Sequence, residues 1–308
     1  MSNAIKDFSI FKKIFPYITE RKKLDLIRYN KKLQNLFNIK LINYKIMSEK
    51  YKIGETNGKG KEYNNEGGLI FEGEYLNEKR NGKGKEYNNK SELIFEGEYL
   101  NGDRNGKGKD IYNDGKLKFE GEYKDGKKWN GKGYDKNGKM IYELINGNGN
   151  IKEYNNDGEL EFEGEYLNGK RNGRGTEYYD GVLRFEGEYL NGERNGKGNE
   201  YNDKNKMEFE GEYLNGKRNG KGKEYDYDGK LEFEGEYING ERNGKGKEYN
   251  NDGELEFEGE FLNGKRNGNG KEYDYNGILL FEGEYLDGKR NMSFFKVLNK
   301  FINLWYYF

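Results

Sequence analysis

The chain has 308 residues and a formal net charge of −1, with 36% charged and 32% apolar residues. So little apolar material argues against two ordinary globular domains and would by itself suggest disorder. However, aromatic residues reach 16% and recur at fixed spacing, which a disordered chain has no reason to maintain. Because the sequence has no cysteine and no histidine, it excludes disulfides, thiolate metal sites, cysteine nucleophiles and histidine acid–base catalysis.

Residues 1–50 form a basic segment, in which twelve Lys or Arg and four Asp or Glu give a net charge of +8. Pro16 is expected to break or kink the first of its helices. The pattern predicts a small α-helical N-terminal module, whose basic surface is either simply solvated or meets an acidic partner or an anionic membrane. The apolar residues at helical spacing are Phe8, Phe11, Phe15, Ile18, Leu24, Ile27, Leu33, Leu36 and Phe37.

The same segment resembles an F-box, from the run Ile14-Phe15-Pro16-Tyr17-Ile18 through Leu24 to Leu33. It departs from that family in lacking the usual Leu-Pro opening and in having Leu33 where the family often has Trp. The resemblance implies docking to a Skp1-like linker, and the alternative is a helical cap on the repeats that follow. The candidate partner contacts are Ile14, Phe15, Leu24, Ile27 and Leu33.

Residues 51–291 are organised by the pentad Phe-Glu-Gly-Glu-Tyr. Successive pentads start 24 residues apart, except for one step of 23 and one gap of 43. A period in the twenties is typical of an array of one small supersecondary unit. The aromatics predicted to form a structural ladder are Phe71, Tyr75, Phe95, Tyr99, Phe119, Tyr123, Phe162, Tyr166, Phe185, Tyr189, Phe209, Tyr213, Phe233, Tyr237, Phe257, Phe261, Phe281 and Tyr285.

Each repeat reads as two strands. Phe257, Gly259 and Phe261 alternate with glutamates, which is the period of two expected of a strand with one apolar and one charged face. Asn263-Gly264 predicts a tight turn, and a second short strand follows at 268–273. We therefore expect a mainly β fold, in which hairpins join into one elongated, single-layer antiparallel β-meander. Lysines of the second strands would balance the glutamate face.

The glycines inside the strands have two expected roles. Gly259 leaves a gap over which an aromatic side chain from an adjacent strand can lie. Strict alternation also places Tyr249 on the face of Lys245 and Lys247, away from the apolar row. A bulge near 244–246 would change this, and the sequence leaves the register open.

The repeat, for example Phe209–Tyr225, resembles the MORN repeat. That pattern is aromatic-x-Gly-x-aromatic, then Asn-Gly, then Gly-x-Gly followed by aromatics. The stretch 228–231, Asp-Gly-Lys-Leu, is similar to MORN-variant repeats. The resemblance extends over 51–291 and implies an elongated β-hairpin array that acts as a scaffold or adaptor. For some members of the family it also implies association with membranes and phosphoinositides.

Residues 119–161 are the irregular part of the array. Trp129 stands where other repeats carry Arg, and the unit that begins at Tyr142 has lost its Glu-Gly-Glu-Tyr. The region is either a decayed repeat or a bend or partner site. In the second case Trp129 is a candidate partner contact.

Residues 292–308 are apolar, with Phe294, Val297, Phe301 and Trp305 on one helical face. They predict a short C-terminal helix, which either caps the edge of the last hairpin or anchors the chain at a membrane interface. The segment is short for a membrane span, and the N-terminus has no apolar signal-peptide core. We expect an intracellular location, cytoplasmic or peripheral to a membrane.

Motifs that resemble catalytic or ligand sites are explained by the repeat. Asn-Gly-Lys-Gly-Lys lacks the ending and the helix of a phosphate loop, and the run 226–229 lacks EF-hand spacing. Glutamate pairs recur in nearly every repeat, whereas a catalytic pair needs one special environment. We therefore expect no catalytic residue, no metal and no cofactor.

The expected function is a non-enzymatic scaffold that binds a protein through the charged or aromatic face of the sheet, without a nucleic-acid partner. Two alternatives remain open. One is an F-box-type substrate adaptor of a ubiquitin ligase, and the other is a scaffold in weak contact with an anionic or phosphoinositide-bearing membrane.

Overall fold

The computed structural model describes residues 50–54 and 56–291. The predicted helical module of 1–50, apart from Lys50, and the predicted helix of 292–308 lie outside the described residues. So do the candidate contacts in the F-box-like segment. Among the described residues every regular element is a β-strand, as expected for a mainly β fold.

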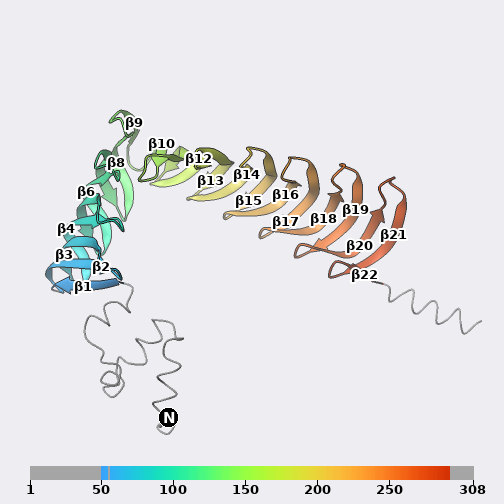
Figure 1. Cartoon of the computed structure of the whole chain (residues 1–308), viewed down its shortest axis with the longest axis horizontal. Coiled ribbons are helices and arrows are strands. Elements are labelled where there is room, and N and C mark those ends of the chain that lie inside the picture. Colours follow the sequence, from blue (N-terminus) through green and yellow to red (C-terminus); the bar gives the residue numbers. More distant parts are fainter. Residues whose placement is uncertain (1–49, 55, 292–308) are drawn as a thin grey trace, which may run out of the picture. The chain divides into compact units, whose positions relative to one another are not determined.

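The strands form two antiparallel sheets, and in each sheet the spatial order is the chain order (Figure 1). The first sheet contains β1 (Lys50–Gly54), β2 (Gly58–Asn64), β3 (Leu69–Leu76), β4 (Lys79–Tyr87), β5 (Leu93–Leu100), β6 (Asp103–Ile111), β7 (Leu117–Lys124), β8 (Lys127–Tyr134) and β9 (Met140–Leu144). The second contains β10 (Gly149–Tyr154), β11 (Leu160–Leu167), β12 (Lys170–Tyr179), β13 (Val182–Leu190), β14 (Glu193–Tyr201), β15 (Met207–Leu214), β16 (Lys217–Tyr225), β17 (Leu231–Ile238), β18 (Glu241–Tyr249), β19 (Leu255–Leu262), β20 (Lys265–Tyr273), β21 (Leu279–Leu286) and β22 (Lys289–Arg290).

The meander is thus divided into two sheets, whereas we expected one. The division falls between β9 and β10, inside the irregular stretch 119–161. The backbone also separates into two compact units between Met140 and Ile141. The shortened unit there has no complete pentad, and between β9 and β10 the ladder is reduced to an isolated bridge between Ile145 and Asn148.

Most of the hairpins that begin with the pentad strand are closed by an Asn-Gly turn, which also bonds to the hairpin before it; the exceptions have Asn77-Glu78, Asp125-Gly126 and Asp287-Gly288. Asn215 and Gly216 both have positive φ, 50° and 80°, as a two-residue hairpin turn of the type favoured by Asn-Gly requires. The Gly216 N–H donates to the carbonyl of Arg194 in the previous hairpin, at 2.9 Å. One hairpin further on, the Asn239 N–H donates to Asn219 Oδ1 at 3.3 Å. The hydrogen bonds of these regularly spaced turns therefore hold successive hairpins together.

A bulge of three residues interrupts the pairing within each regular hairpin. In β15–β16 the three residues 219–221 lie opposite the single residue Glu212. Gly220 adopts a φ of +99°, which a residue with a side chain would adopt only with strain. The Lys221 N–H donates to the Glu212 carboxylate at 3.3 Å. The second glutamate of the pentad therefore satisfies a backbone donor that the bulge leaves without a ladder partner.

The bulge does not move Tyr249 to the apolar row. In β18 the bulged residues are 243–245, and the alternation that places Tyr249 begins at Lys245, the last of them. The Tyr249 hydroxyl donates to Glu234 at 2.7 Å, and Lys247 Nζ lies 3.9 Å from the same carboxylate. Strict alternation therefore holds from Lys245 to Tyr249, and Tyr249 belongs to the charged face.

The core of this single-layer sheet is a row of phenylalanine rings lying on glycines. The ring of Phe209 is fully buried. A Cβ built on Gly211, in the same strand, would lie 2.7 Å from Phe209 Cζ, and one built on Gly222, in the next strand, would lie 2.4 Å from it. The ring thus occupies the space that two side chains would need, and this removes it from water without a second layer of structure.

Candidate functional site

The two faces of each sheet have different chemistry. Antiparallel partners that lie directly opposite share a face, so Phe209, Tyr213, Arg218 and Glu224 lie together on what we call the ladder face. The remaining side chains of the pentads and of the second strands lie on the other side, which we call the groove face. Glu210, paired with Lys223, is an example.

On the ladder face, tyrosines separate the phenylalanine rings. Phe209 meets Tyr213 of its own strand at 5.6 Å and Tyr237 of the next hairpin at 5.2 Å, both edge to face. Such pairs contribute about 0.5–1.5 kcal/mol beyond the burial of area. Because most of the tyrosines contact two phenylalanines, one in their own strand and one in the preceding hairpin, the contacts couple neighbouring hairpins within a sheet.

The structure places the predicted ladder aromatics on this face. All are buried except Tyr166 and Phe281, which are partly buried. Phe281 lies in β21, whose following strand β22 has only two residues, so a full second strand is lacking there among the described residues. The aromatic rings are therefore covered by other side chains, and they are not available to a partner in the folded chain.

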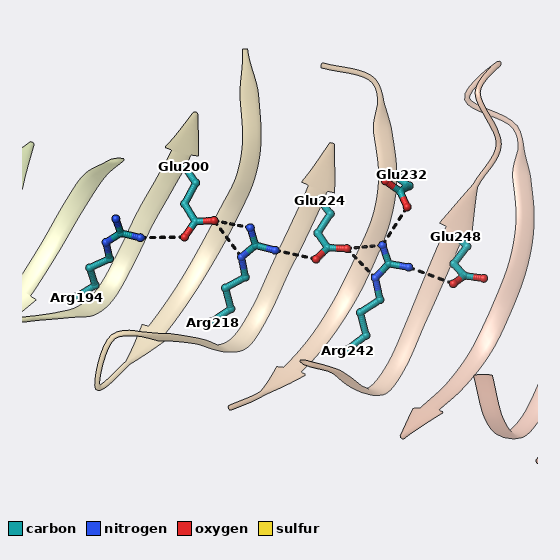
Figure 2. Close-up of polar contacts among 7 residues, drawn as sticks. All are labelled: Arg194, Glu200, Arg218, Glu224, Glu232, Arg242 and Glu248. Carbon is teal, nitrogen blue, oxygen red and sulfur yellow. Dashed lines mark hydrogen bonds and ion pairs between the residues drawn. The ribbon is translucent and has the colours of Figure 1, made fainter. Parts of the chain in front are cut away.

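Arginines cover the rings, and glutamates link the arginines into a continuous chain. Figure 2 shows this row along neighbouring strands. Arg218 Nη1 lies 2.8 Å from Glu224, and the other side of its guanidinium is bound to Glu200 of the previous hairpin. Arg242 repeats the arrangement between Glu224 and Glu248.

The environment of these ions favours their charged forms. Burial by itself lowers the pKa of Arg218, but the hydrogen bond and charge of Glu200 and the charge of Glu224 outweigh it and raise the pKa. Burial likewise raises the pKa of Glu177, yet the hydrogen bond and charge of Arg194 bring that pKa below its ordinary value. The ions of the ladder face are thus satisfied by one another, and this face is a structural element.

The sequence reasoning did not single out these ions. The signal was present, since an arginine follows nearly every Asn-Gly turn and a glutamate precedes the tyrosine that ends nearly every second strand. The arginines of the row are Arg80, Arg104, Arg171, Arg194, Arg218, Arg242, Arg266 and Arg290.

Trp129 does not occupy the predicted arginine position, although it precedes Asn130-Gly131 as arginine precedes Asn-Gly in other repeats. Tyr123 pairs with Lys128, and Trp129 is the residue left over where the register shifts. Lys128 takes the arginine's place, with its Nζ 3.0 Å from Asp110 and 4.8 Å from the centre of the Phe119 ring. The half-buried Trp129 ring lies under Lys124 Nζ, at 4.5 Å.

The groove face of the second sheet contains a groove of about 1010 Å³. Its floor is a line of glycines across eight strands, namely Gly198, Gly211, Gly222, Gly235, Gly246, Gly259, Gly270 and Gly283. Its walls are the glutamates, lysines and asparagines on either side of each glycine. The first sheet has a groove of the same construction, of about 1180 Å³, over the glycines from Gly60 to Gly121.

The two walls of the groove differ in how their charges are satisfied. On one wall, Lys223 Nζ lies 3.2 Å from Glu210, which also accepts a bond from the Tyr225 hydroxyl at 2.9 Å. On the other, Glu212 binds the bulge backbone, and the exposed side chain of Lys221 has no ion pair with another described residue. Lys221 nevertheless lies directly opposite Glu236 of the next strand, so this wall, like the other, carries charges of both signs beside the glycine floor.

The acidic loops that resembled a calcium site have a backbone role. The Asp226 carboxylate accepts bonds from the Asp228 N–H at 3.0 Å and the Lys230 N–H at 2.8 Å, which closes the loop between β16 and β17. Within the described residues, no cluster of acidic side chains has the arrangement of a metal site. That part of the chain likewise contains no helix with the length and apolarity of a membrane span.

Comparison with known proteins agrees with the repeat pattern. A family model described as the MORN repeat matches seven stretches, 71–91, 95–116, 162–181, 185–205, 209–230, 233–254 and 257–278. The irregular region 119–161 is not matched. No curated protein matches the chain.

Two of the solved structures that match the chain have low similarity to it. The structure titled "Crystal structure of GtfA/B complex bound to UDP and GlcNAc" has 10% identity and a TM-score of 0.18, over 42% of this chain and 25% of that chain. The structure titled "Crystal Structure of TcdB2-TccC3 without hypervariable C-terminal region" has 11% identity and a TM-score of 0.19, over 68% of this chain and 14% of that chain. This chain thus matches about a quarter or less of their length.

Proposed function

This chain is a MORN-repeat protein, and from that premise we propose that it is a non-enzymatic scaffold that binds a partner protein along the groove face of its sheets. The observation that carries the proposal is the contrast between the two faces. On the ladder face the aromatics are buried and the ions are paired with one another, whereas the groove face leaves a floor of glycine accessible between walls of lysine and glutamate. A partner would therefore meet the groove.

A scaffold also accounts for the acidic residues better than catalysis does. The glutamates of the pentad recur in repeat after repeat, and their partners recur with them. Glu210 binds Lys223 and Tyr225, and Glu234 binds Lys247 and Tyr249 in the same manner. A catalytic carboxylate needs an environment unlike that of its neighbours. The equivalence of the repeats supports an extended binding surface.

The test is capture of proteins from a eukaryotic cell lysate by the immobilised full chain, with identification by mass spectrometry. The groove variant is Lys223→Glu/Lys247→Glu, and the matched control is Lys206→Glu/Lys217→Glu, which makes the same charge change outside the groove lining. Circular dichroism checks that both variants fold. We expect a set of proteins that the groove variant loses and the control retains. Equal capture by both variants would contradict binding along the groove.

The adaptor and membrane hypotheses depend on residues 1–50 and 292–308 and stay predictions of the sequence. The same holds for an intracellular or cytoplasmic location.

A further inference from the structure

The residue that follows each pentad of the second sheet is an exposed aliphatic residue. Leu214 directly follows Tyr213 and precedes the Asn215-Gly216 turn, and 49% of it is exposed. In the sheet register it lies opposite Lys217, the first residue after the turn. We call these aliphatic residues and the residues opposite them the turn stripe. The aliphatic residues are Leu167, Leu190, Leu214, Ile238, Leu262 and Leu286, which are 48–60% exposed.

Folding of the hairpin does not require an apolar side chain at this position. In the first sheet, Lys124 occupies the equivalent place at the end of β7, and the hairpin there still forms, with Lys127 opposite. Exposed apolar residues are ordinary when they are scattered singly. In the second sheet one recurs in each of six successive hairpins, along the same edge, and such a row with charged neighbours is typical of an interaction surface. None of these residues lines the groove.

The residues opposite the aliphatic row carry alternating charges. In chain order they are Lys170, Glu193, Lys217, Glu241, Lys265 and Lys289. All are exposed. The first four have no ion pair with another described residue, whereas Lys265 Nζ lies 3.7 Å from Asp287. The hairpins from β11 to β18 therefore present four unpaired charges whose sign alternates.

This pattern is complementary to itself when a second copy lies against it in the reverse direction. Two copies of one surface have the same spacing by construction, so the match does not depend on the value of that spacing. With a two-fold axis at Leu214, Glu193 of each copy lies opposite Lys217 of the other. Lys170 then lies opposite Glu241, so all four unpaired charges of each copy meet a charge of opposite sign. An isologous contact of this type gives a closed dimer.

The same axis also brings the aliphatic residues together. Leu214 lies opposite its own copy, and Leu190 lies opposite Ile238. Leu167 lies opposite Leu262. These side chains are about half exposed in the single chain, so the contact removes apolar surface from water, which favours association. The charges and the apolar residues therefore select the same axis.

Other registers of the two stripes are less favourable. A shift by one hairpin places like charges opposite each other, either Glu193 against Glu193 or Lys217 against Lys217. A shift by two hairpins restores the alternation, but it either shortens the contact or places Lys170 against Lys289. The alternation of sign along the stripe therefore selects one antiparallel register.

We propose that the turn stripe of the second sheet binds the same stripe of a second copy of this chain, as an antiparallel dimer with its two-fold axis at Leu214. The inference goes beyond the proposed scaffold function and does not rest on it. It identifies the partner as a second copy because the order of charges along the stripe is matched by its own reverse.

Sedimentation velocity of the full chain over a range of concentrations measures the association. The variants Glu193→Lys and Lys217→Glu each convert both central ion pairs of the dimer into like-charge pairs. The double variant Glu193→Lys/Lys217→Glu exchanges the two charges and restores the pairing. Asp103→Lys is the matched control, since Asp103 is exposed and lies opposite Leu100 at the equivalent position of the first sheet. Circular dichroism checks that each variant folds.

We expect a dimer for the wild type and a dissociation constant about tenfold higher for each single variant, as loss of exposed ion pairs implies. The double variant, the control and an equimolar mixture of the two single variants should dimerise like the wild type, since opposite charges meet in each. Leu214→Asp should prevent dimerisation, because it places two carboxylates at the axis. Because neither Glu193 nor Lys217 has an ion pair with a described residue of its own copy, neither single variant should change the urea midpoint of the monomer.

A monomeric wild type would overturn the inference, and the proposed scaffold function would stand. A dimer that neither single variant weakens, or a double variant that stays as weak as the single ones, would overturn it as well. The lysate test remains separate, because its groove variant leaves the turn stripe unchanged. Its control variant contains Lys217→Glu, so proteins that this control still captures bind without the dimer.

Discussion

The guanidinium carbon of Arg218 lies 4.2 Å from the centre of the Phe209 ring and covers the side of the ring that faces away from the sheet. With glycines beneath the ring and tyrosines at its edges, this contact explains how a single layer of β-structure buries a phenylalanine completely. Interactions of this kind contribute about 0.5–2 kcal/mol, more when the cation is removed from water.

Replacement of Arg218 should therefore destabilise the array, and the loss should be smaller when the new side chain retains more of the arginine's contacts. Arg218→Met leaves Glu200 and Glu224 without their shared cation, and we expect a loss of about 2 kcal/mol. Arg218→Lys should lose about half as much, because Lys128 fills the equivalent place in the first sheet with one ion pair and a ring contact. Urea unfolding followed by circular dichroism measures both. Equal losses for the two variants would show that the positive charge that lysine retains contributes nothing at this position.

The close approach of ring and backbone makes Gly222 sensitive to the smallest side chain. In Gly222→Ala the new Cβ would lie 2.4 Å from Phe209 Cζ, so the ring must move from its buried position. Gly216→Ala is the matched control, since it has a φ of +80° and no neighbouring atom within 4 Å. The control should cost about 1–2 kcal/mol from its backbone conformation alone. Gly222→Ala should cost more, and a smaller effect on the urea midpoint would argue against the packing described above.

Acid should weaken the ladder at Glu177. Its folded pKa lies below the ordinary value of 4.5, because Arg194 and Arg171 outweigh the effect of burial. Such a group contributes stability that is fully present above its unfolded pKa and is lost as the pH falls through the folded pKa. The stability difference between wild type and Glu177→Gln should thus be largest near neutral pH and shrink below about pH 4.5.

Urea midpoints measured across this pH range provide the test for Glu177. The exposed Glu193, changed to Gln, serves as the control for loss of one negative charge. A difference that stays constant down to strong acid would exclude a linked protonation of Glu177.

Alkali should weaken the groove face at Tyr249. Burial and the hydrogen bond to Glu234 raise the pKa of Tyr249 to about 12. Since the folded pKa is above the ordinary value of 10.0, the stability that the neutral phenol contributes is present below pH 10 and is lost as the pH rises towards 12. At neutral pH, Tyr249→Phe should lose at most about 1 kcal/mol, the net value of one hydrogen bond.

Thermal unfolding of wild type and Tyr249→Phe at increasing pH measures this effect. The advantage of the wild type should fall between about pH 10 and 12. The difference in tyrosinate absorbance between wild type and Tyr249→Phe, which isolates Tyr249 from the other tyrosines, should appear near pH 12. Ionisation of Tyr249 at the ordinary pKa would contradict its bond to Glu234.

The predictions from sequence were confirmed where they depend on the conformations of neighbouring residues and recur in every repeat. Alternation along Phe257, Gly259 and Phe261 identified a strand, and Asn263-Gly264 identified the turn, because side-chain period and positive φ are properties of neighbouring residues. The position of Trp129 was predicted wrongly, because this repeat has one extra residue before Asn130-Gly131, and spacing from Phe119 instead gives Lys128, which pairs with Tyr123. The division into two sheets was also missed, because it depends on the contacts that the shortened unit fails to make.

The sequence by itself determined that this protein is an array of β-hairpins, since the pentad and the Asn-Gly turns encode strand and turn within each repeat. Only the tertiary structure decided which face is covered by its own side chains and which is open. The Glu200–Arg218–Glu224 row joins residues of successive hairpins, and it closes over Phe209 once the strands are in register. Burial and ion pairing are properties of that register, so the structure was needed to assign the aromatics to the core and the glycines and lysines to the groove.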